Sequence, residues 1–423
     1  MDAQRDRPSR LHEQVTQHLQ QGLIPYWFAR AWDAEYGGYL TNFDEQGDRL
    51  DTPEKYLNTQ CRLLWWFSTL YRRHPDLKQA GDLAAKGFEF MLAHFWDAER
   101  GGWYWKVQRD GSRLDDGKVV YGESFAIYAL SEYTLATGDG RGLAYAAQTF
   151  DLLQKYAADT QRAGYLENLE QDWSPAPPGF AAGDRKSLDT HMHLLESFTT
   201  LYAASGEEIH RRKLLEVANL IVTRMVDPVT GCGRNQFDLD WQPIPAIAIR
   251  RTWNAEREGD APATPTDTTS YGHNVELAWL LNRALQTAGA DPTPYYPVMR
   301  RLLDHAVAHG VDWEMGGIYR DGVASGEALI KEKEFWQHAE SLVGFLDGYA
   351  TFGEPVYLDA FECIWRFVSA HMIAQDVGEW RTLLDRDGRA IDGRLGNPWK
   401  VAYHTGRSML ECASRLDNLL GRT

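Results

Sequence analysis

Cysteine is scarce in this chain of 423 residues, and its four cysteines stand far apart without a CxxC pair. Their spacing excludes a disulfide framework and a zinc knuckle, and favours a reducing cytoplasm. Long apolar runs are also missing, since no stretch reaches the roughly eighteen apolar residues of a membrane span. Residues 1–14 have no apolar segment of the signal-peptide type. The sequence therefore predicts a soluble, unexported protein without a membrane partner.

Basic residues are outnumbered, with 44 Lys and Arg against 60 Asp and Glu, for a formal net charge of -16. A surface of that sign repels phosphate backbones, so nucleic acid is excluded as an expected partner. The sequence also contains no Walker loop, dinucleotide fingerprint, GxSxG elbow or HExxH motif. Phosphoryl transfer, hydride transfer and serine hydrolysis therefore lack their usual signatures.

Aromatic residues are plentiful, with 16 Trp, 20 Tyr and 16 Phe. Most of them are expected in a large core. Ring faces also pack against the C–H faces of sugars, so a carbohydrate site is the second interpretation of the same composition.

A short phrase, in most copies an acidic residue followed by glycine and then large residues, recurs six times at intervals of roughly 60 to 85 residues. The copies are Trp32–Leu40, Trp96–Trp105, Arg162–Leu166, Asp227–Phe237, Val311–Tyr319 and Asp376–Trp380. Between the phrases, apolar residues recur at helical spacing, with two helices in each interval. Six helical hairpins that pack side by side predict an all-α fold, an (α/α)6 barrel with short β-hairpins or loops at the active-site face. We expect one domain over residues 1–423, with an open solenoid as the alternative.

One interval is longer than the others because it contains a segment at about residues 241–270 that is rich in Pro, Asp, Thr and Ala. Long loops in compact domains are often lids or binding loops. A solvated insertion without a function is the other interpretation of this segment.

Histidines cluster at the predicted starts of inner helices. Those of interest are His191, His193, His273, His338 and His404. If the hairpins close into a ring, equivalent helix ends converge on one cavity. The pairs His193 with Glu196 and His273 with Glu276 are three residues apart, which places each pair on one helix face. The alternative is a polar helix terminus at which the histidine only makes structural hydrogen bonds.

A metal centre is the other alternative for paired His and Glu on helices. Di-iron sites in helical bundles normally place Glu before His, and here the order is reversed. We therefore expect no metal and no other cofactor.

The remaining inventory is imidazoles, carboxylates and indoles, with Arg62 on the first inner helix and with Tyr121 and Glu123 at the start of another. Imidazoles with a pKa near 6.5 can remove and return protons at neutral pH. This inventory suits proton transfer beside a carbonyl. A glycosidase on the same fold would need two carboxylates flanking the scissile bond, and a sugar-binding protein would need only the indoles.

Several runs of residues resemble one known family over nearly the whole chain. They are Arg62–Trp65, Tyr121–Leu130, Thr190–Glu196, Tyr271–Glu276, Glu340–Phe345, Gly378–Trp380 and Trp399–Arg407. With them the chain resembles the N-acylglucosamine 2-epimerase superfamily, most closely its cellobiose 2-epimerase branch, with the mannose 2-epimerases close by. The resemblance implies an (α/α)6 barrel and a cofactor-independent isomerase. The implied reaction inverts C2 of a reducing sugar through a cis-enediolate.

The resemblance also implies roles for individual residues. His273 and His404 match the acid/base pair, and His193 matches a third histidine near the sugar oxygens. Arg62 matches the arginine that steadies the enediolate. The expected substrate-binding set is Arg62, Tyr121, Glu123, His191, Glu196, Glu276, Trp336, His338, Glu340 and Trp399.

Some positions depart from the cellobiose pattern. Phe335–His338 stands where those enzymes usually have Trp-Trp-Pro-Gln, and His338 is similar to the N-acylglucosamine enzymes. The THMH run with His193 favours the cellobiose and mannose branches. We expect a mono- or disaccharide as the partner and a monomer or homodimer. Mannose–fructose isomerisation and N-acylglucosamine epimerisation remain open.

Overall fold

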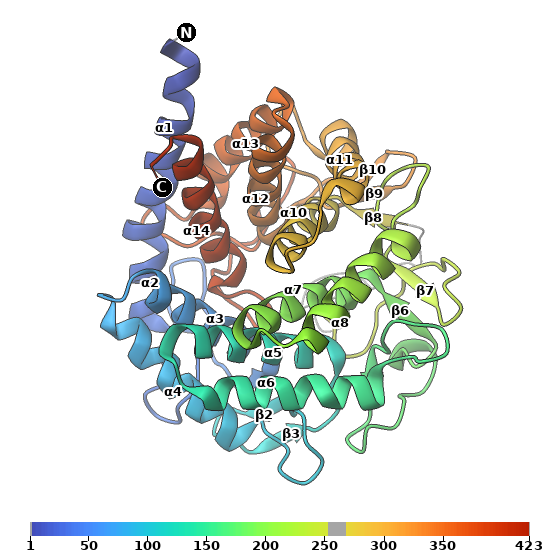
Figure 1. Ribbon diagram of the computed structural model, residues 1–423. Helices are drawn as coiled ribbons and strands as arrows, with labels where there is room; N and C mark the ends of the chain where they lie inside the picture. The colour runs from blue at the N-terminus through green and yellow to red at the C-terminus, as the bar shows by residue number, and fades with distance from the viewer. Residues whose placement is uncertain (1, 253–267, 423) are drawn as a thin grey trace.

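The computed structural model describes residues 2–252 and 268–422, and these residues are predominantly helical, as the sequence predicts. Six helices form an inner set, which Figure 1 shows around the centre of the molecule. They are α3 (Leu57–Arg73), α5 (Val120–Thr137), α7 (Leu188–Ser205), α10 (Tyr271–Thr287), α12 (Phe335–Phe352) and α14 (Ala402–Leu419).

The inner helices contact one another in a closed cycle. Helix α3 packs on α5, α5 on α7, α7 on α10, α10 on α12 and α12 on α14, and α14 packs back on α3. An open solenoid would leave its first and last repeats apart. The contact between α14 and α3 therefore closes a ring.

A second set of helices packs on the outside of the ring. It consists of α4 (Lys78–His94), α6 (Gly140–Leu152), α8 (Glu208–Leu220), α11 (Tyr296–His305), α13 (Pro355–Phe367) and α1 (Asp2–His18), with the short α2 (Ile24–Arg30) after α1. The first five each follow their inner partner in the chain. The sixth pair differs from the predicted hairpins, because α14 at the C-terminus packs against α1 at the N-terminus, as Figure 1 shows.

The two sets differ in how they bury their side chains. Helix α5 is buried from Val120 to Tyr133 on every side, so apolar residues predominate all round it. Outer helix α11 buries only one face, with Val298, Met299 and Leu302 among its buried residues. No helix in the ranges 2–252 and 268–422 is long and apolar enough to cross a bilayer.

Short antiparallel sheets cover one end of the ring. Each pairs the strand just before an inner helix with the strand or strands that follow its outer partner, so each sheet joins the two ends of one helical pair. The sheets are β1 (Glu54–Tyr56), β2 (Lys106–Gln108) and β3 (Arg113–Asp115); β4 (Lys118–Val119) and β5 (Asn168–Leu169); β6 (Arg185–Ser187) and β7 (Gln236–Asp238); β8 (Thr268–Ser270), β9 (Asp321–Val323) and β10 (Ala328–Ile330); and β11 (Lys333–Glu334), β12 (Leu383–Leu384) and β13 (Ala390–Asp392).

The acidic residue of the repeated phrase has a structural partner. In five repeats a carboxylate pairs with a fully buried lysine two residues before an inner helix, at distances of 2.9 to 3.2 Å. In the third repeat this carboxylate is Asp159, three residues before the phrase, and in the sixth it is Glu379, which follows the glycine. In the fourth repeat Asp227 pairs with Arg234 instead, and Thr269 stands at the lysine position. The five pairs are Lys55–Asp33, Lys118–Asp97, Lys186–Asp159, Lys333–Asp312 and Lys400–Glu379.

Candidate active site

A cavity of about 450 Å³ lies at the N-terminal ends of the inner helices. This size is within the usual range for small-molecule sites. All six inner helices contribute to its wall, so residues far apart in the sequence meet there. They include Arg62, Tyr121, Asp189, His193, His273, Glu276, Trp336 and His404.

The sixth residue of each inner helix forms a layer beneath or at this cavity. Because every inner helix begins at the same level of the ring, equivalent residues converge. The six are Arg62, Phe125, His193, Glu276, Glu340 and Arg407. Five of them are charged or titratable, and all are buried.

His404 is held by a buried carboxylate. Its Nδ1 lies 2.7 Å from Oε1 of Glu340, and Arg407 lies 2.8 Å from the same oxygen. Burial lowers the pKa of His404 well below its usual range, and the charge of Arg62 acts in the same direction. His404 is therefore neutral at pH 7, and its Nδ1–H donates to Glu340 while Nε2 is left for the cavity side.

His273 reaches the cavity from the first turn of α10. The Ser270 hydroxyl caps this turn by accepting from the His273 backbone N–H at 3.4 Å. Burial lowers the pKa of His273 to about 4, against the opposite effect of the Asp189 carboxylate. The indole of Trp336 contacts both imidazoles, with ring centroids 4.5 Å from His273 and 5.9 Å from His404. The two rings thus share one aromatic wall.

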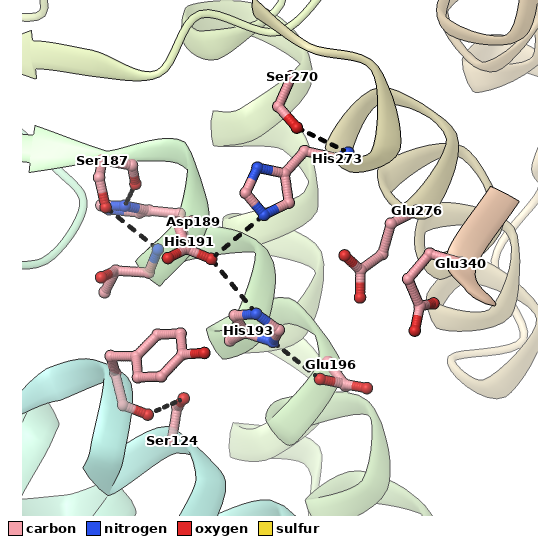
Figure 2. Close-up of polar contacts among 12 residues, drawn as sticks. Ser124, Ser187, Asp189, His191, His193, Glu196, Ser270, His273, Glu276 and Glu340 are labelled. Atoms are coloured by element: carbon pink, nitrogen blue, oxygen red, sulfur yellow. Dashed lines mark hydrogen bonds and ion pairs between the residues drawn. The ribbon is translucent and has the colours of Figure 1, made fainter. Parts of the chain in front are cut away.

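His193 lies between two carboxylates of its own helix. Nε2 is 3.3 Å from Asp189 and Nδ1 is 3.0 Å from Glu196. Figure 2 shows this arrangement, with Asp189 between His193 and His273. Glu196 also accepts from the Tyr403 hydroxyl at 2.6 Å and from Arg407. Glu196 is therefore a support for His193 beneath the cavity wall.

Arg62 is fixed at the cavity by two hydrogen bonds. It donates through Nη2 to the Tyr121 hydroxyl at 2.7 Å and through Nη1 to the Trp399 carbonyl at 2.8 Å. Its guanidinium also lies over the Phe125 ring, 4.5 Å from the centroid. These contacts hold a positive charge at the cavity wall. Tyr121, Trp336 and Trp399 also line the cavity, and their part in substrate binding stays a prediction.

Three predicted site residues face away from the cavity, which corrects the sequence analysis. Glu123 accepts from the Trp103 backbone N–H at 2.9 Å. His191 accepts from the Tyr165 N–H and contacts the Ser187 carbonyl. His338 likewise accepts from the Ile318 N–H and contacts the Glu334 carbonyl.

These three occupy the fourth position of their helices, where Gln60 on α3 and Asn274 on α10 bind a loop N–H in the same way. Backbone groups use both ring nitrogens of each histidine. In the described structure Glu123, His191 and His338 anchor the glycine-containing loops. We therefore remove these three residues from the substrate-binding set.

Asp189, Tyr403 and Arg407 are site residues that the sequence analysis missed. Asp189 lines the cavity one helical turn before His193, and the i,i+4 spacing of the two could have indicated it. Arg407 follows His404 by three residues, which places both on one face of α14. Its contacts with Glu196, Glu276 and Glu340 come from three other helices, so only the folded ring reveals them.

One group of possible metal ligands occurs in the described part of the chain. It consists of Glu276, Glu340 and His404, whose ligand atoms lie within 4.8 Å of one another. The Arg407 guanidinium lies 2.8 Å from each carboxylate and places a positive charge between them. Burial raises the pKa of both carboxyls well above their usual range, which makes them weaker anionic ligands. The donor set therefore fits an arginine-bridged pair of carboxylates, which Figure 2 shows side by side, better than a metal centre.

A second cavity of about 370 Å³ adjoins the first. Tyr121, Asp189, His273 and Trp399 line both. The far wall of the second cavity is more apolar, with Ile247, Ile249, Leu329 and Ile330.

Part of the long 241–270 segment forms this wall. Arg251 binds Asp115 of β3, at 2.6 and 2.9 Å. The segment 241–252 is thereby attached to the second repeat. The rest of the predicted lid, residues 253–267, lies outside the described residues.

Comparison with known proteins identifies relatives over the whole chain. The family model for N-acylglucosamine 2-epimerase matches residues 38–408. A cellobiose 2-epimerase of Bacteroides fragilis is 29% identical over 409 residues, covering 95% of this chain and 98% of that protein. The N-acylglucosamine 2-epimerase of Homo sapiens is 25% identical over 430 residues, covering 100% and 94%.

The same relationship holds among solved structures. The cellobiose 2-epimerase from Spirochaeta thermophila superimposes with a TM-score of 0.86 and 27% identity, covering 98% of both chains. The fold and the sequence of this chain therefore point to the same relatives.

Proposed function

The chain belongs to the N-acylglucosamine 2-epimerase family, a family of sugar isomerases, and we propose that it interconverts the C2 epimers of a reducing sugar of the cellobiose or mannose type. The observation that carries this proposal is the pair of imidazoles of His273 and His404 on two helices, both against Trp336 in the cavity wall. Proton removal and proton return at one carbon need two such groups, one for each face.

In the proposed reaction, one neutral imidazole takes the C2 proton of the open-chain sugar. The C–H electron pair becomes the C1–C2 double bond of an enediolate, and the carbonyl oxygen gains the negative charge. The other imidazole, in its protonated imidazolium form, then gives a proton to the opposite face of C2. This restores the carbonyl, inverts the centre and leaves that ring neutral, so each turnover exchanges which of the two rings carries the extra proton. Glu340 supports this exchange because it holds Nδ1 of His404 and leaves Nε2 for the substrate.

Arg62 supplies the positive charge that the enediolate needs. Its hydrogen bonds to Tyr121 and to the Trp399 carbonyl fix the guanidinium before substrate arrives. A fixed positive group costs no reorganisation when charge develops, so it stabilises the transition state more than the ground state.

The substrate class follows from the relatives and from the cavity. Cellobiose 2-epimerases and N-acylglucosamine 2-epimerases are named among them, so a reducing glucose- or mannose-type sugar is the shared chemistry. Trp336 and Trp399 line the cavity, and indole rings are suited to packing against the C–H faces of a sugar. The outer part of the first cavity and the adjoining second cavity leave room for a disaccharide.

The test is NMR in D₂O after treatment of the protein with a chelator, with cellobiose, mannose, glucose and N-acetylglucosamine supplied separately. We expect deuterium at C2 together with the C2 epimer for one of these sugars. Deuterium at C1 with a ketose product would instead favour the aldose–ketose isomerase. Cleaved cellobiose would favour a glycoside hydrolase, and the absence of any exchange would contradict the proposal.

Two variants assign the exchange to the imidazoles. His273→Asn and His404→Asn each lower epimerisation by about 10²- to 10⁴-fold, because each removes one acid/base group. The matched control is His12→Asn on outer helix α1, and it retains the wild-type rate. The imidazole of His12 pairs with Asp417 near the C-terminal end of α14, away from the cavity. If both cavity variants kept wild-type epimerisation, the acid/base assignment would be wrong.

We further propose that the closed ring is an (α/α)6 barrel that forms one domain over residues 1–423. The cyclic contacts of the six inner helices support this architecture. A cytoplasmic location is part of the same proposal, because all four cysteines are buried and free.

A further inference from the structure

Asp189 occupies a special position in the cavity. One of its carboxylate oxygens lies 3.3 Å from Nε2 of His193 and 3.6 Å from Nε2 of His273. Figure 2 shows it directly between the two rings, which come from different helices. The side chain lines both cavities at the point where they join.

The Asp189 carboxylate favours one tautomer of each imidazole that it faces. An ionised carboxylate only accepts hydrogen bonds, so its charge favours a hydrogen on each ring nitrogen that faces it. The contact with His193, at 3.3 Å, is within hydrogen-bond distance, and the contact with His273, at 3.6 Å, is an ion-pair contact. His273 then has hydrogen on Nε2, and its Nδ1 keeps the lone pair. On the other side, Glu340 accepts from Nδ1 of His404. Each ring of the proposed acid/base pair is thus held by its own carboxylate, through opposite nitrogens.

We propose that Asp189 is a positioning residue that fixes the tautomer and the ring orientation of His273, as Glu340 does for His404. This inference rests on the proposed epimerase function and deepens it. The carboxylate works through His273 and takes no proton from the sugar itself. His193, held on its other side by Glu196, completes the rigid support of Asp189.

The charges around Asp189 allow this role. Burial acts to raise the pKa of Asp189, but His193, His273 and Arg62 outweigh it and the pKa is lowered, so the carboxylate is ionised at neutral pH. In return Asp189 raises the pKa of His273 against the effect of burial. The groups that face this carboxylate from all packed elements are Arg62 of α3, Tyr121 of α5, His193 of α7, His273 and Glu276 of α10, and Glu167 before β5.

The experiment compares C2–H exchange in D₂O from each epimer separately, under initial-rate conditions. In a two-base enzyme each imidazole exchanges the proton of one epimer, and His273→Asn identifies the epimer that His273 serves. We expect Asp189→Asn to slow exchange of that same epimer by about 10- to 100-fold and to leave the other epimer within a few-fold of wild type. The acid limb of the affected exchange moves to lower pH, because the carboxylate that raises the pKa of His273 is gone.

Asp189→Ser is measured in parallel and tests the same contact with a smaller side chain if the amide perturbs folding. Asp240→Asn, an exposed member of the Arg162 ion pair, is the control for the loss of one negative charge and behaves as wild type. Equal slowing of both epimers, or an unchanged pH profile with unchanged exchange, would overturn the role of Asp189. A wild-type protein that exchanges no sugar at all overturns the proposed function first, so the two failures are distinguishable.

Discussion

The position of a histidine on its inner helix decides whether its ring faces the cavity or a loop backbone. His191 and His193 are the fourth and sixth residues of α7, and two residues correspond to about 200° of rotation about the helix axis. His193 therefore lies between cavity carboxylates, while His191 binds the Tyr165 N–H. His338 is also a fourth residue and behaves like His191.

This distinction predicts how the protein responds to acid. Burial lowers the pKa of His338 to about 3, whereas the pKa of an unfolded histidine is about 6.5. As the pH falls below about 6.5, the unfolded state takes up the proton first. The stability that the neutral ring contributes is therefore complete above about 6.5 and is lost progressively toward the folded pKa, by on the order of 1 kcal/mol per pH unit.

His338→Gln tests this argument, because a glutamine binds the equivalent loop in α3, where Gln60 accepts from the Tyr39 N–H and donates to the Tyr39 carbonyl. We expect a cost of about 1 kcal/mol at pH 7, a smaller loss of stability between pH 7 and pH 5 than in wild type, and epimerase activity within a few-fold. Urea unfolding at both pH values measures it. An unchanged pH dependence, or an inactive but folded variant, would contradict the structural role.

Sequence reasoning could identify the residue types of this site but only part of their orientation. His193, His273 and His404 stand near the starts of recognisable helices, so their convergence was predictable once a ring was inferred. Glu123 and His338 were misassigned because the first helical residue, which fixes the rotation of each side chain, cannot be located to one residue from sequence. Arg407 was missed because its carboxylate partners lie on three other helices.

At the scale of elements, the buried lysine–carboxylate pairs connect the start of an inner helix to the preceding loop. Lys118, at the start of β4, lies 2.9 Å from Asp97 with both side chains fully buried. Asp97 also accepts from the Glu99 and Arg100 N–H groups, so it organises the turn that carries the glycines. The pair therefore aligns α5 with the end of α4.

Lys118→Met is expected to lower the free energy of unfolding by about 3–5 kcal/mol, because it leaves the Asp97 carboxylate buried without its partner. The control is Arg300→Met in the exposed pair with Glu354, where the loss stays below about 1 kcal/mol. Urea unfolding of both variants gives the comparison. Similar small losses in the two would show that the buried pair adds nothing to the alignment.

The helices themselves were predictable, since their apolar periodicity is strong and the repeats reinforce one another. The structural role of the acidic residues could not be predicted, because the lysine that pairs with each of them stands roughly 20 residues later in the chain. The two meet only when the loop between them is folded. The sixth helical pair could not be predicted as a hairpin, because α14 packs against α1 at the opposite end of the chain.

At the scale of the whole molecule, ring closure depends on how closely α14 approaches α3. Gly406 faces the ring of Trp66, which is fully buried, and a Cβ at Gly406 would lie well inside contact distance of that indole. The glycine is needed here for space, since its φ is not in the left-handed region. The seam between the last and first repeats is therefore tightly packed, as a closed ring requires.

Gly406→Ala forces the indole or the helices apart at this seam, and overpacking of this kind typically costs about 1–3 kcal/mol. Because every repeat of a closed ring has two neighbours, we expect the loss as one cooperative transition at lower temperature, with calorimetry and circular dichroism in agreement. Gly140→Ala at the start of α6, where a Cβ meets nothing within 4 Å, is the matched control and leaves stability unchanged or slightly higher. A variant that unfolds in two steps, with the terminal repeats first, would indicate that the contact between α14 and α3 contributes little and that the molecule behaves as an open array.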